Sequence, residues 1–133
     1  MPAKTPTADQ PAPTEAELGV LRVLWDRGAS TVREVFDVIA SGKTVGYTTV
    51  LKQMQVMHQK GLLTRSERFR SHVYEPTVER SVTQRQLAAT ILQQAFDGSA
   101  RGLLQSALAG RKVDAKELDE IRALLDEYQR RRK

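Results

Sequence analysis

Residues 46–76, GYTTVLKQMQVMHQKGLLTRSERFRSHVYEP, constrain the fold most strongly, because a helical pattern changes there into a strand-like one. Apolar residues recur at helical spacing along one face until Gly61 ends the segment. After Gly61, β-favouring residues alternate over 63–66 and again over 72–74, and a polar turn at 67–71 joins the two runs. The stretch therefore predicts an amphipathic helix followed by a β-hairpin.

Two short helices are expected before this stretch, and each begins at a T-x-x-E capping box. Thr14 and Glu17 form the first box, and apolar residues follow it at helical spacing. Thr31 and Glu34 form the second box. Three short helices followed by a β-hairpin is the order of elements in a winged helix-turn-helix. We therefore predict a winged-helix domain over residues 14–77.

The segments on either side of this domain have different patterns. Residues 1–13 hold four of the five prolines and show no apolar periodicity, so we expect a disordered N-terminal arm. Residues 78–133 return to helical spacing, with breaks at Asp97 and before Asp114, and predict three helices. The expected fold class is mainly α with a small β-hairpin: a winged helix-turn-helix domain followed by an all-helical domain.

Basic residues are concentrated in the predicted helix and hairpin. Between Lys43 and Tyr74 there are six of them against one acid, so this window alone accounts for the net charge of +5. No acid occurs in the helix over 47–60, and phosphate would repel one on a face that enters the DNA major groove. Thr, Gln and Lys can contact base edges, and Arg can bind phosphates. The residues assigned to DNA binding are Thr48, Thr49, Lys52, Gln53 and Gln55 on the helix, and Arg65, Arg68 and Arg70 on the hairpin.

The C-terminal segment has more apolar surface than three short helices can bury among themselves. A second copy of the chain could cover the surplus, which makes this segment a candidate dimerisation domain. A self-contained three-helix core is the alternative. The residues assigned to dimerisation are Leu87, Ile91, Leu103, Leu104, Leu108, Leu118, Ile121, Leu125 and Tyr128.

Other classes of function find less support. There is no cysteine, and the isolated His58 and His72 are a poor basis for a metal site, so we expect neither metal nor cofactor. An enzyme is disfavoured because no nucleophile–base pair, carboxylate pair or Gly-rich phosphate loop can be recognised. The sequence has no apolar run of membrane-spanning length and no signal-peptide pattern, so we expect a cytoplasmic protein without membrane insertion. A winged-helix module that binds an acidic protein partner is the alternative to DNA binding.

The ordered set of motifs resembles the BlaI/MecI penicillinase-repressor family, which includes copper-responsive CopY-type repressors. The segments that carry the resemblance are PTEAELGVLRVLWDRG, STVREVFDVI, YTTVLKQMQVMHQKGLLTR, HVYEP, FDGSARGLLQSAL and DAKELDEIRALLDEY. The resemblance implies a homodimeric transcriptional repressor that binds palindromic double-stranded operator DNA. It assigns base reading to Thr48, Thr49, Lys52 and Gln55, and wing contacts to Arg68 and Arg70.

The chain also departs from the family pattern. It has Lys52 where the family commonly has threonine and Val56 where it often has arginine, so the operator sequence is not carried over. The resemblance further implies a membrane-linked sensor protease that cuts the dimerisation domain, here near Ser106 and Ala107. The Asn-Phe pair found at that bond in the penicillinase repressors is missing, as is the cysteine motif of the copper-responsive relatives. No direct metal switch is therefore expected.

Overall fold

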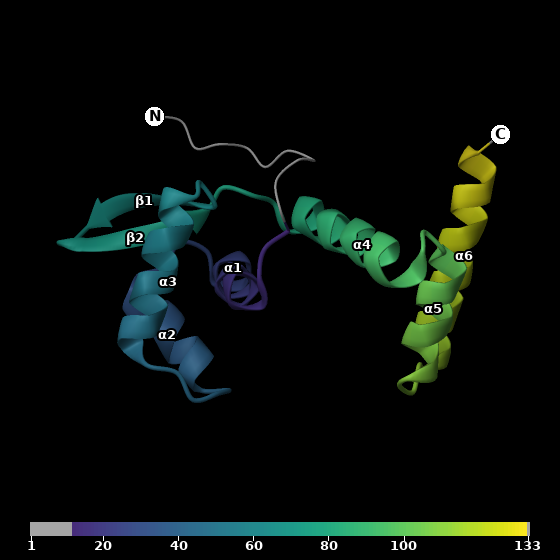
Figure 1. Ribbon diagram of the computed structural model, residues 1–133, viewed down its shortest axis with the longest axis horizontal. Helices are drawn as coiled ribbons and strands as arrows, with labels where there is room; N and C mark the ends of the chain where they lie inside the picture. Colours follow the sequence, from purple (N-terminus) through teal and green to yellow (C-terminus); the bar gives the residue numbers. More distant parts are fainter. Residues whose placement is uncertain (1–11, 133) are drawn as a thin grey trace. The chain divides into compact units, whose positions relative to one another are not determined.

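The computed structural model describes residues 12–132 (Figure 1). Its elements are α1 (Glu15–Arg27), α2 (Val32–Ala40), α3 (Tyr47–Gln59), β1 (Leu63–Arg68), β2 (Ser71–Pro76), α4 (Arg80–Phe96), α5 (Ala100–Ala109) and α6 (Ala115–Arg131). The two strands form one antiparallel sheet. The chain divides into two compact units between Thr90 and Ile91, so α4 contributes to both. The expected N-terminal arm over residues 1–13 lies almost entirely outside the described residues.

The first unit is built around α1, α2 and α3, with the hairpin beside them (Figure 1). Each helix turns its apolar stripe toward one shared core, as the 3.6-residue spacing predicts. The largest fully buried apolar side chains of that core are Tyr74, Leu21, Leu24, Met54, Met57, Leu63, Val20 and Val35. The winged helix-turn-helix predicted from the sequence is therefore confirmed, and its third helix is held on the core along one complete face.

Both predicted capping boxes form. The Thr14 hydroxyl accepts a hydrogen bond from the Glu17 backbone N–H at 3.2 Å, and the Glu17 carboxylate accepts one from the Thr14 N–H at 2.9 Å. Thr31 and Glu34 make the same reciprocal pair at the start of α2. A cap of this kind stabilises a helix by about 1 kcal/mol and defines where it begins.

Glu17 also joins the start of α1 to the end of α3. The residue is 3% exposed, and the Nζ of Lys60 donates a hydrogen bond to its carboxylate at 2.8 Å. Burial alone would raise the pKa of Glu17, but the hydrogen bonds from Lys60 and Thr14 together hold the pKa below its ordinary value. Lys60 therefore has a structural role, although it belongs to the basic window recognised in the sequence.

The hairpin is longer than its sequence pattern predicts. The strands pair along their whole length, so that Arg68 lies opposite Ser71 and only two residues form the loop. These residues, Phe69 and Arg70, have positive φ angles of 52° and 65°. Positive φ at both positions matches the twist of the strands in a two-residue hairpin loop. The sequence pattern predicted strands that were too short, because residues 67–71 are mainly polar and contain no Asn or Gly that would indicate so tight a turn.

The base of the hairpin is attached to the helices through Tyr74. Its backbone N–H donates to the Ser30 carbonyl at 2.8 Å and its carbonyl accepts from the Ser30 N–H at 3.1 Å. The Tyr74 ring is 1% exposed and meets His58 of α3 edge to face, with 6.4 Å between ring centroids. The hairpin is therefore fixed at its base both to the α1–α2 connection and to α3.

The helix predicted from Val78 begins two residues later, at Arg80. Val78 is instead buried, and its carbonyl accepts a hydrogen bond from the Trp25 Nε1 at 3.0 Å. The Arg80 guanidinium lies 5.5 Å from the centroid of the Trp25 ring and pairs with Asp26. Trp25 packs half-buried against the core and also holds the first turn of α4 on α1.

The second unit comprises the end of α4 with α5 and α6. Ser99 caps α5 and Asp114 caps α6 through their side chains. From Ile91 to Arg132 no described residue is buried. The large apolar side chains that are exposed in this unit are Ile91, Leu124, Leu125 and Tyr128, at 48–62% exposure. We refer to these four residues as the uncovered apolar face.

Over residues 12–132, no helix has the length and apolar character that crossing a bilayer requires.

Candidate nucleic-acid interface

α3 presents two chemically different faces. One face packs on the core through three buried apolar residues, Val50, Met54 and Met57. The opposite face is exposed and carries the predicted base-reading residues Thr48, Lys52 and Gln55. Since successive residues are 100° apart around a helix, these three side chains point in similar directions. α3 contains no acidic residue, so this face is suited to the electronegative major groove.

Thr49 and Gln53 lie on the flank of α3. Both line a cavity of about 130 Å³ that is shared with α1 and with the segment preceding α3. Gln53 is half-buried there, whereas Thr49 is exposed. Gln59, which was not among the assigned residues, is exposed and shares the face of Lys52 because the two are seven residues apart, close to two helical turns.

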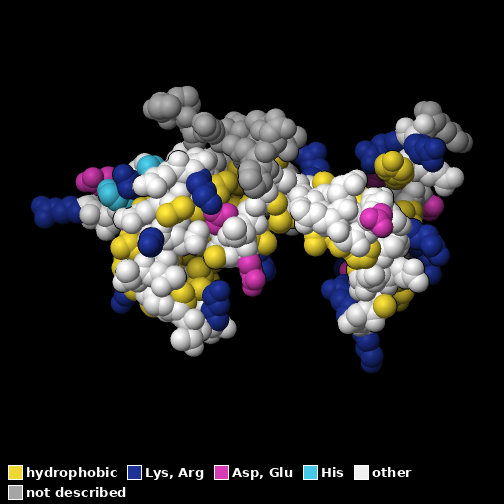
Figure 2. All heavy atoms as spheres, viewed as in Figure 1, with side chains coloured by type: hydrophobic (Ala, Val, Ile, Leu, Met, Phe, Trp, Pro, Cys, Tyr) yellow, Lys and Arg dark blue, Asp and Glu magenta, His cyan; other side chains and the backbone are white. Residues whose placement is uncertain are grey.

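The hairpin, called the wing from here, carries the other predicted DNA-binding residues. Arg65, Arg68 and Arg70 are all exposed. Among residues 12–132, no carboxylate lies at ion-pair distance from these arginines or from Lys52. Figure 2 shows Lys or Arg side chains at the outer end of the wing. These charges are therefore available to an anionic ligand.

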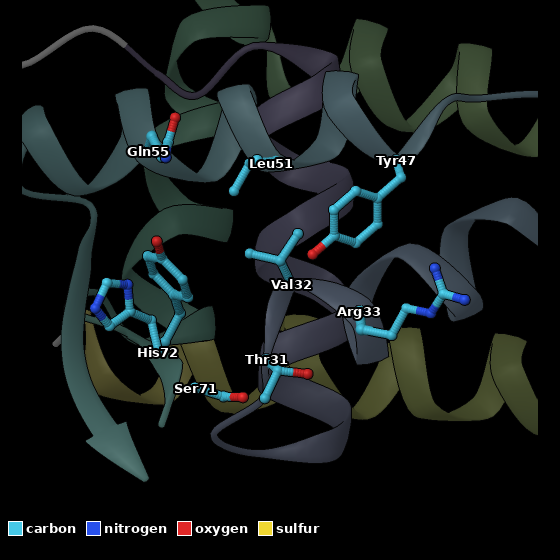
Figure 3. A pocket seen from close by; sticks show the side chains of 9 residues that line it. Thr31, Val32, Arg33, Tyr47, Leu51, Gln55, Ser71 and His72 are labelled. Carbon is cyan, nitrogen blue, oxygen red and sulfur yellow. The ribbon is translucent and has the colours of Figure 1, made fainter. Parts of the chain in front are cut away.

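A groove of about 270 Å³ separates α3 from the wing and from the start of α2. Figure 3 looks into it and shows the side chains that line it: Thr31, Val32, Arg33, Tyr47, Leu51, Gln55, Ser71, His72 and Tyr74. Gln55 is thus the one predicted base-reading residue that also faces the wing across this groove. Ser71 and His72 bring hydrogen-bonding groups to the opposite side.

Arg33 is a candidate contact that the sequence analysis missed. Its guanidinium lies 5.8 Å from the ring centroid of Phe36 and 5.7 Å from that of Tyr47, and its nearest carboxylate is that of Asp37 at 3.9 Å. The two rings orient an exposed cation on the rim of the groove. The window of basic residues began at Lys43 and so left Arg33 out, although its position inside the capping box of α2, between Thr31 and Glu34, could have indicated it.

Local electrostatics at the start of α2 favour an ionised carboxylate beside the wing. The hydrogen bond from the Thr31 N–H is the main reason why the pKa of Glu34 lies below its ordinary value. The charges of Arg27 and Arg68 lower this pKa further, and Arg27 also forms an ion pair with Glu34 at 3.2 Å. Arg68 thus has the carboxylate of Glu34 in its neighbourhood.

The residues predicted to mediate dimerisation are distributed over α4, α5 and α6. Six of them are half-buried: Leu87, Leu103, Leu104, Leu108, Leu118 and Ile121. The other three, Ile91, Leu125 and Tyr128, belong to the uncovered apolar face. Leu124 belongs to this face too, at 60% exposure, and was not predicted. Ser106 and Ala107, where cleavage was expected, are exposed on α5.

Within residues 12–132, no three side chains of the types His, Cys, Asp or Glu gather as a metal site would require.

Comparison with known proteins extends over both units. The transcriptional regulator BlaI of Mycobacterium tuberculosis is 31% identical over 118 residues, which are 86% of this chain and 83% of that protein. The penicillinase repressor of Bacillus licheniformis is 23% identical over 123 residues, 92% of this chain and 96% of that protein. The penicillinase repressor of Staphylococcus aureus is 19% identical over 116 residues, 87% and 92% of the respective chains.

A solved structure supports the fold and a family model supports the relationship. The crystal structure of the YusO protein from Bacillus subtilis superimposes with a TM-score of 0.52 at 18% identity, covering 88% of this chain and 74% of that one. This likeness concerns the fold alone. The model of the penicillinase repressor family matches residues 13–127, which include the winged helix and nearly all of the second unit. The chain therefore belongs to the penicillinase repressor family.

Proposed function

We propose that this protein is a homodimeric transcriptional repressor that binds palindromic double-stranded operator DNA. Membership of the penicillinase repressor family supports the role of repressor. The observation that carries DNA binding is the acid-free exposed face of α3 beside a wing whose arginines form no ion pair with any of residues 12–132. In this proposal α3 enters the major groove, and the wing contacts the adjacent backbone.

Within this interface the side chains have different tasks. Lys52 and Gln55 contact base edges and contribute to sequence choice, because they lie on the outward face of α3. Arg65, Arg68 and Arg70 bind phosphates, which raises affinity for all sequences. Thr48 and Thr49 lie in the first turn of α3, where hydroxyl groups can bond to phosphate or base, and Gln53 approaches the duplex from the flank.

Dimerisation is supported by the second unit. Its described residues include none that is buried, and four large apolar side chains are about half exposed or more. A second copy of the chain would cover these side chains through a two-fold interface, since identical subunits most often pair in this way. A two-fold dimer would present two copies of α3 to major grooves about one helical turn apart on one side of the duplex.

The spacing of half-sites provides the test of this function. The wild-type protein would first select duplexes from a random-sequence pool, and we expect an inverted repeat to be enriched. Inserting about five base pairs between its half-sites, half a helical turn, should abolish tight binding, whereas inserting about ten should restore much of it. Unchanged affinity after the half-turn insertion would refute the dimer on a palindrome. Failure to enrich any sequence would favour the protein-binding alternative.

Release from DNA is proposed to involve cleavage of α5 near Ser106 and Ala107 by a membrane-linked sensor protease. Both residues are exposed, and α5 has no buried residue among its ten, so local unfolding into a protease cleft costs little. Cutting α5 would separate α6 from the rest of its chain. Loss of the dimer would then remove the effective-concentration advantage of two linked winged helices.

A further inference from the structure

The tip of the wing combines two features that the fold does not require. The Phe69 side chain is 92% exposed, the highest exposure among the large apolar residues described, so burial of its ring contributes almost nothing to folding. Its backbone has a φ of 52°, in the left-handed region that bulky side chains rarely adopt. Asn or Gly is the residue usually found at this position of a two-residue hairpin loop. Phe69 is thus an unfavourable choice for both the water-exposed surface and the turn.

The neighbours of Phe69 indicate which partner would favour it. Arg68 and Arg70 flank the ring in the sequence, are exposed and form no ion pair within residues 12–132. An apolar protein pocket that accepted the ring would have to desolvate two guanidinium groups without compensation. Duplex DNA instead offers phosphates on both sides of a groove and an apolar surface of sugars and base faces between them.

The length of the wing is compatible with such a contact. Leu63 is 1% exposed at the base of β1, and Phe69 lies just beyond the far end of that strand. The strand carries the tip on the order of 17 Å away from the core, at about 3.3 Å per residue. Half a turn of B-DNA is about the same distance, so a tip beside a groove-bound α3 can reach the neighbouring minor groove.

We propose that Phe69 is an apolar wedge that enters the minor groove flanking each half-site and packs against a base step between two arginine–phosphate contacts. This inference rests on the proposed DNA-binding function. Wedges of this kind partly unstack one step and bend the duplex toward the major groove. Flexible pyrimidine–purine steps should be preferred at the flank, so Phe69 adds sequence preference at positions that α3 does not touch.

The experiment compares Phe69→Asn with Phe69→Trp in the full-length protein. Asn tolerates a positive φ and therefore preserves the loop, while Trp preserves an aromatic wedge. The probe is a duplex of about 40 base pairs, selected by the wild-type protein from a random pool and labelled at both ends with a fluorescent donor and acceptor. Affinity is measured over a range of salt concentrations, bending by energy transfer between the ends, and stability by thermal unfolding. Arg70→Ala serves as the comparison for a phosphate contact.

We expect Phe69→Asn to bind about tenfold more weakly, with less bending, an unchanged salt dependence and a thermal midpoint equal to or above that of wild type. Phe69→Trp should retain most of the affinity and bending. Arg70→Ala should instead lower the slope of log affinity against log salt by about one.

Three results would overturn the inference. Phe69→Asn could match wild type in affinity and bending, it could weaken binding only by reducing the salt slope, or it could impair self-association while leaving DNA binding intact. The first two would leave the proposed repressor function standing, because the wild-type protein would still bind the selected duplex. A wild-type protein that selects no duplex at all would refute the DNA-binding function itself, and the wedge with it.

Discussion

Replacing Leu125 with alanine tests whether the uncovered apolar face holds two chains together. Leu125 is 55% exposed within a single chain, and alanine preserves the helical propensity of α6. Fully burying a leucine side chain contributes about 2 kcal/mol, so covering the exposed half contributes about 1 kcal/mol. A two-fold dimer loses this contribution twice, about 2 kcal/mol in total, which raises its dissociation constant roughly 30-fold.

Sedimentation of the purified protein over a range of concentrations would measure this constant for wild type, Leu125→Ala and a matched control. Ala123→Ser is the control, because Ala123 is exposed on the opposite side of α6 and should leave the dimer unchanged. Far-ultraviolet circular dichroism would establish that helix content is retained. A Leu125→Ala protein whose dissociation constant stays within about twofold of wild type would refute the reasoning from exposed area.

Three further outcomes follow from the same structure. Gln55→Ala should reduce the free energy of binding to the selected operator by about 1 to 3 kcal/mol and leave binding to random DNA unchanged, whereas Arg70→Ala should weaken binding to both DNAs. Equal losses on the operator and on random DNA for Gln55→Ala would contradict its role in base reading. Glu17→Gln should lower the free energy of unfolding by about 1 to 2 kcal/mol near neutral pH. Because the pKa of Glu17 is lowered in the folded state, its contribution to stability is present above the unfolded pKa of about 4.3 and is lost as pH falls through the folded pKa. The free energies of unfolding of wild type and Glu17→Gln should therefore become equal in acid. A protease site installed across Ser106 and cut in the purified dimer should reduce operator affinity by about 100-fold or more, and a cut protein that stays dimeric and bound would exclude this release point.

Local sequence signals predicted the winged helix well because they act within a few residues. The boxes at Thr14 and Thr31 specify the starts of α1 and α2 through bonds that span three positions, and both form. The change from helical spacing to alternation after Gly61 likewise located the hairpin, because the two periods reflect how side chains leave a helix and a strand. The loop at Phe69 was the exception, since none of the usual turn residues occurs there.

Long-range contacts could not be predicted in this way. The ion pair between Glu17 and Lys60 joins residues 43 positions apart, and the sequence gives each of them an equally good reason to lie in solvent. The two backbone hydrogen bonds between Ser30 and Tyr74 also join distant positions and have no local signal in the sequence. Gln53 lies on the flank of α3 because α1 packs beside it. The sequence does not show this contact, so residue type alone made Gln53 look equivalent to Gln55.

The hydrogen bond between Trp25 and Val78 gives the protein a built-in optical probe. Trp25 is the single tryptophan of the sequence, and both its indole N–H and its ring face, which lies near Arg80, contact the residues that begin α4. Indole emission responds to hydrogen bonding and to nearby charge, so its intensity and wavelength respond to changes in these contacts with Val78 and Arg80. Titrating DNA into unlabelled protein would therefore reveal, from fluorescence, whether the attachment of α4 to the winged helix changes when the duplex binds.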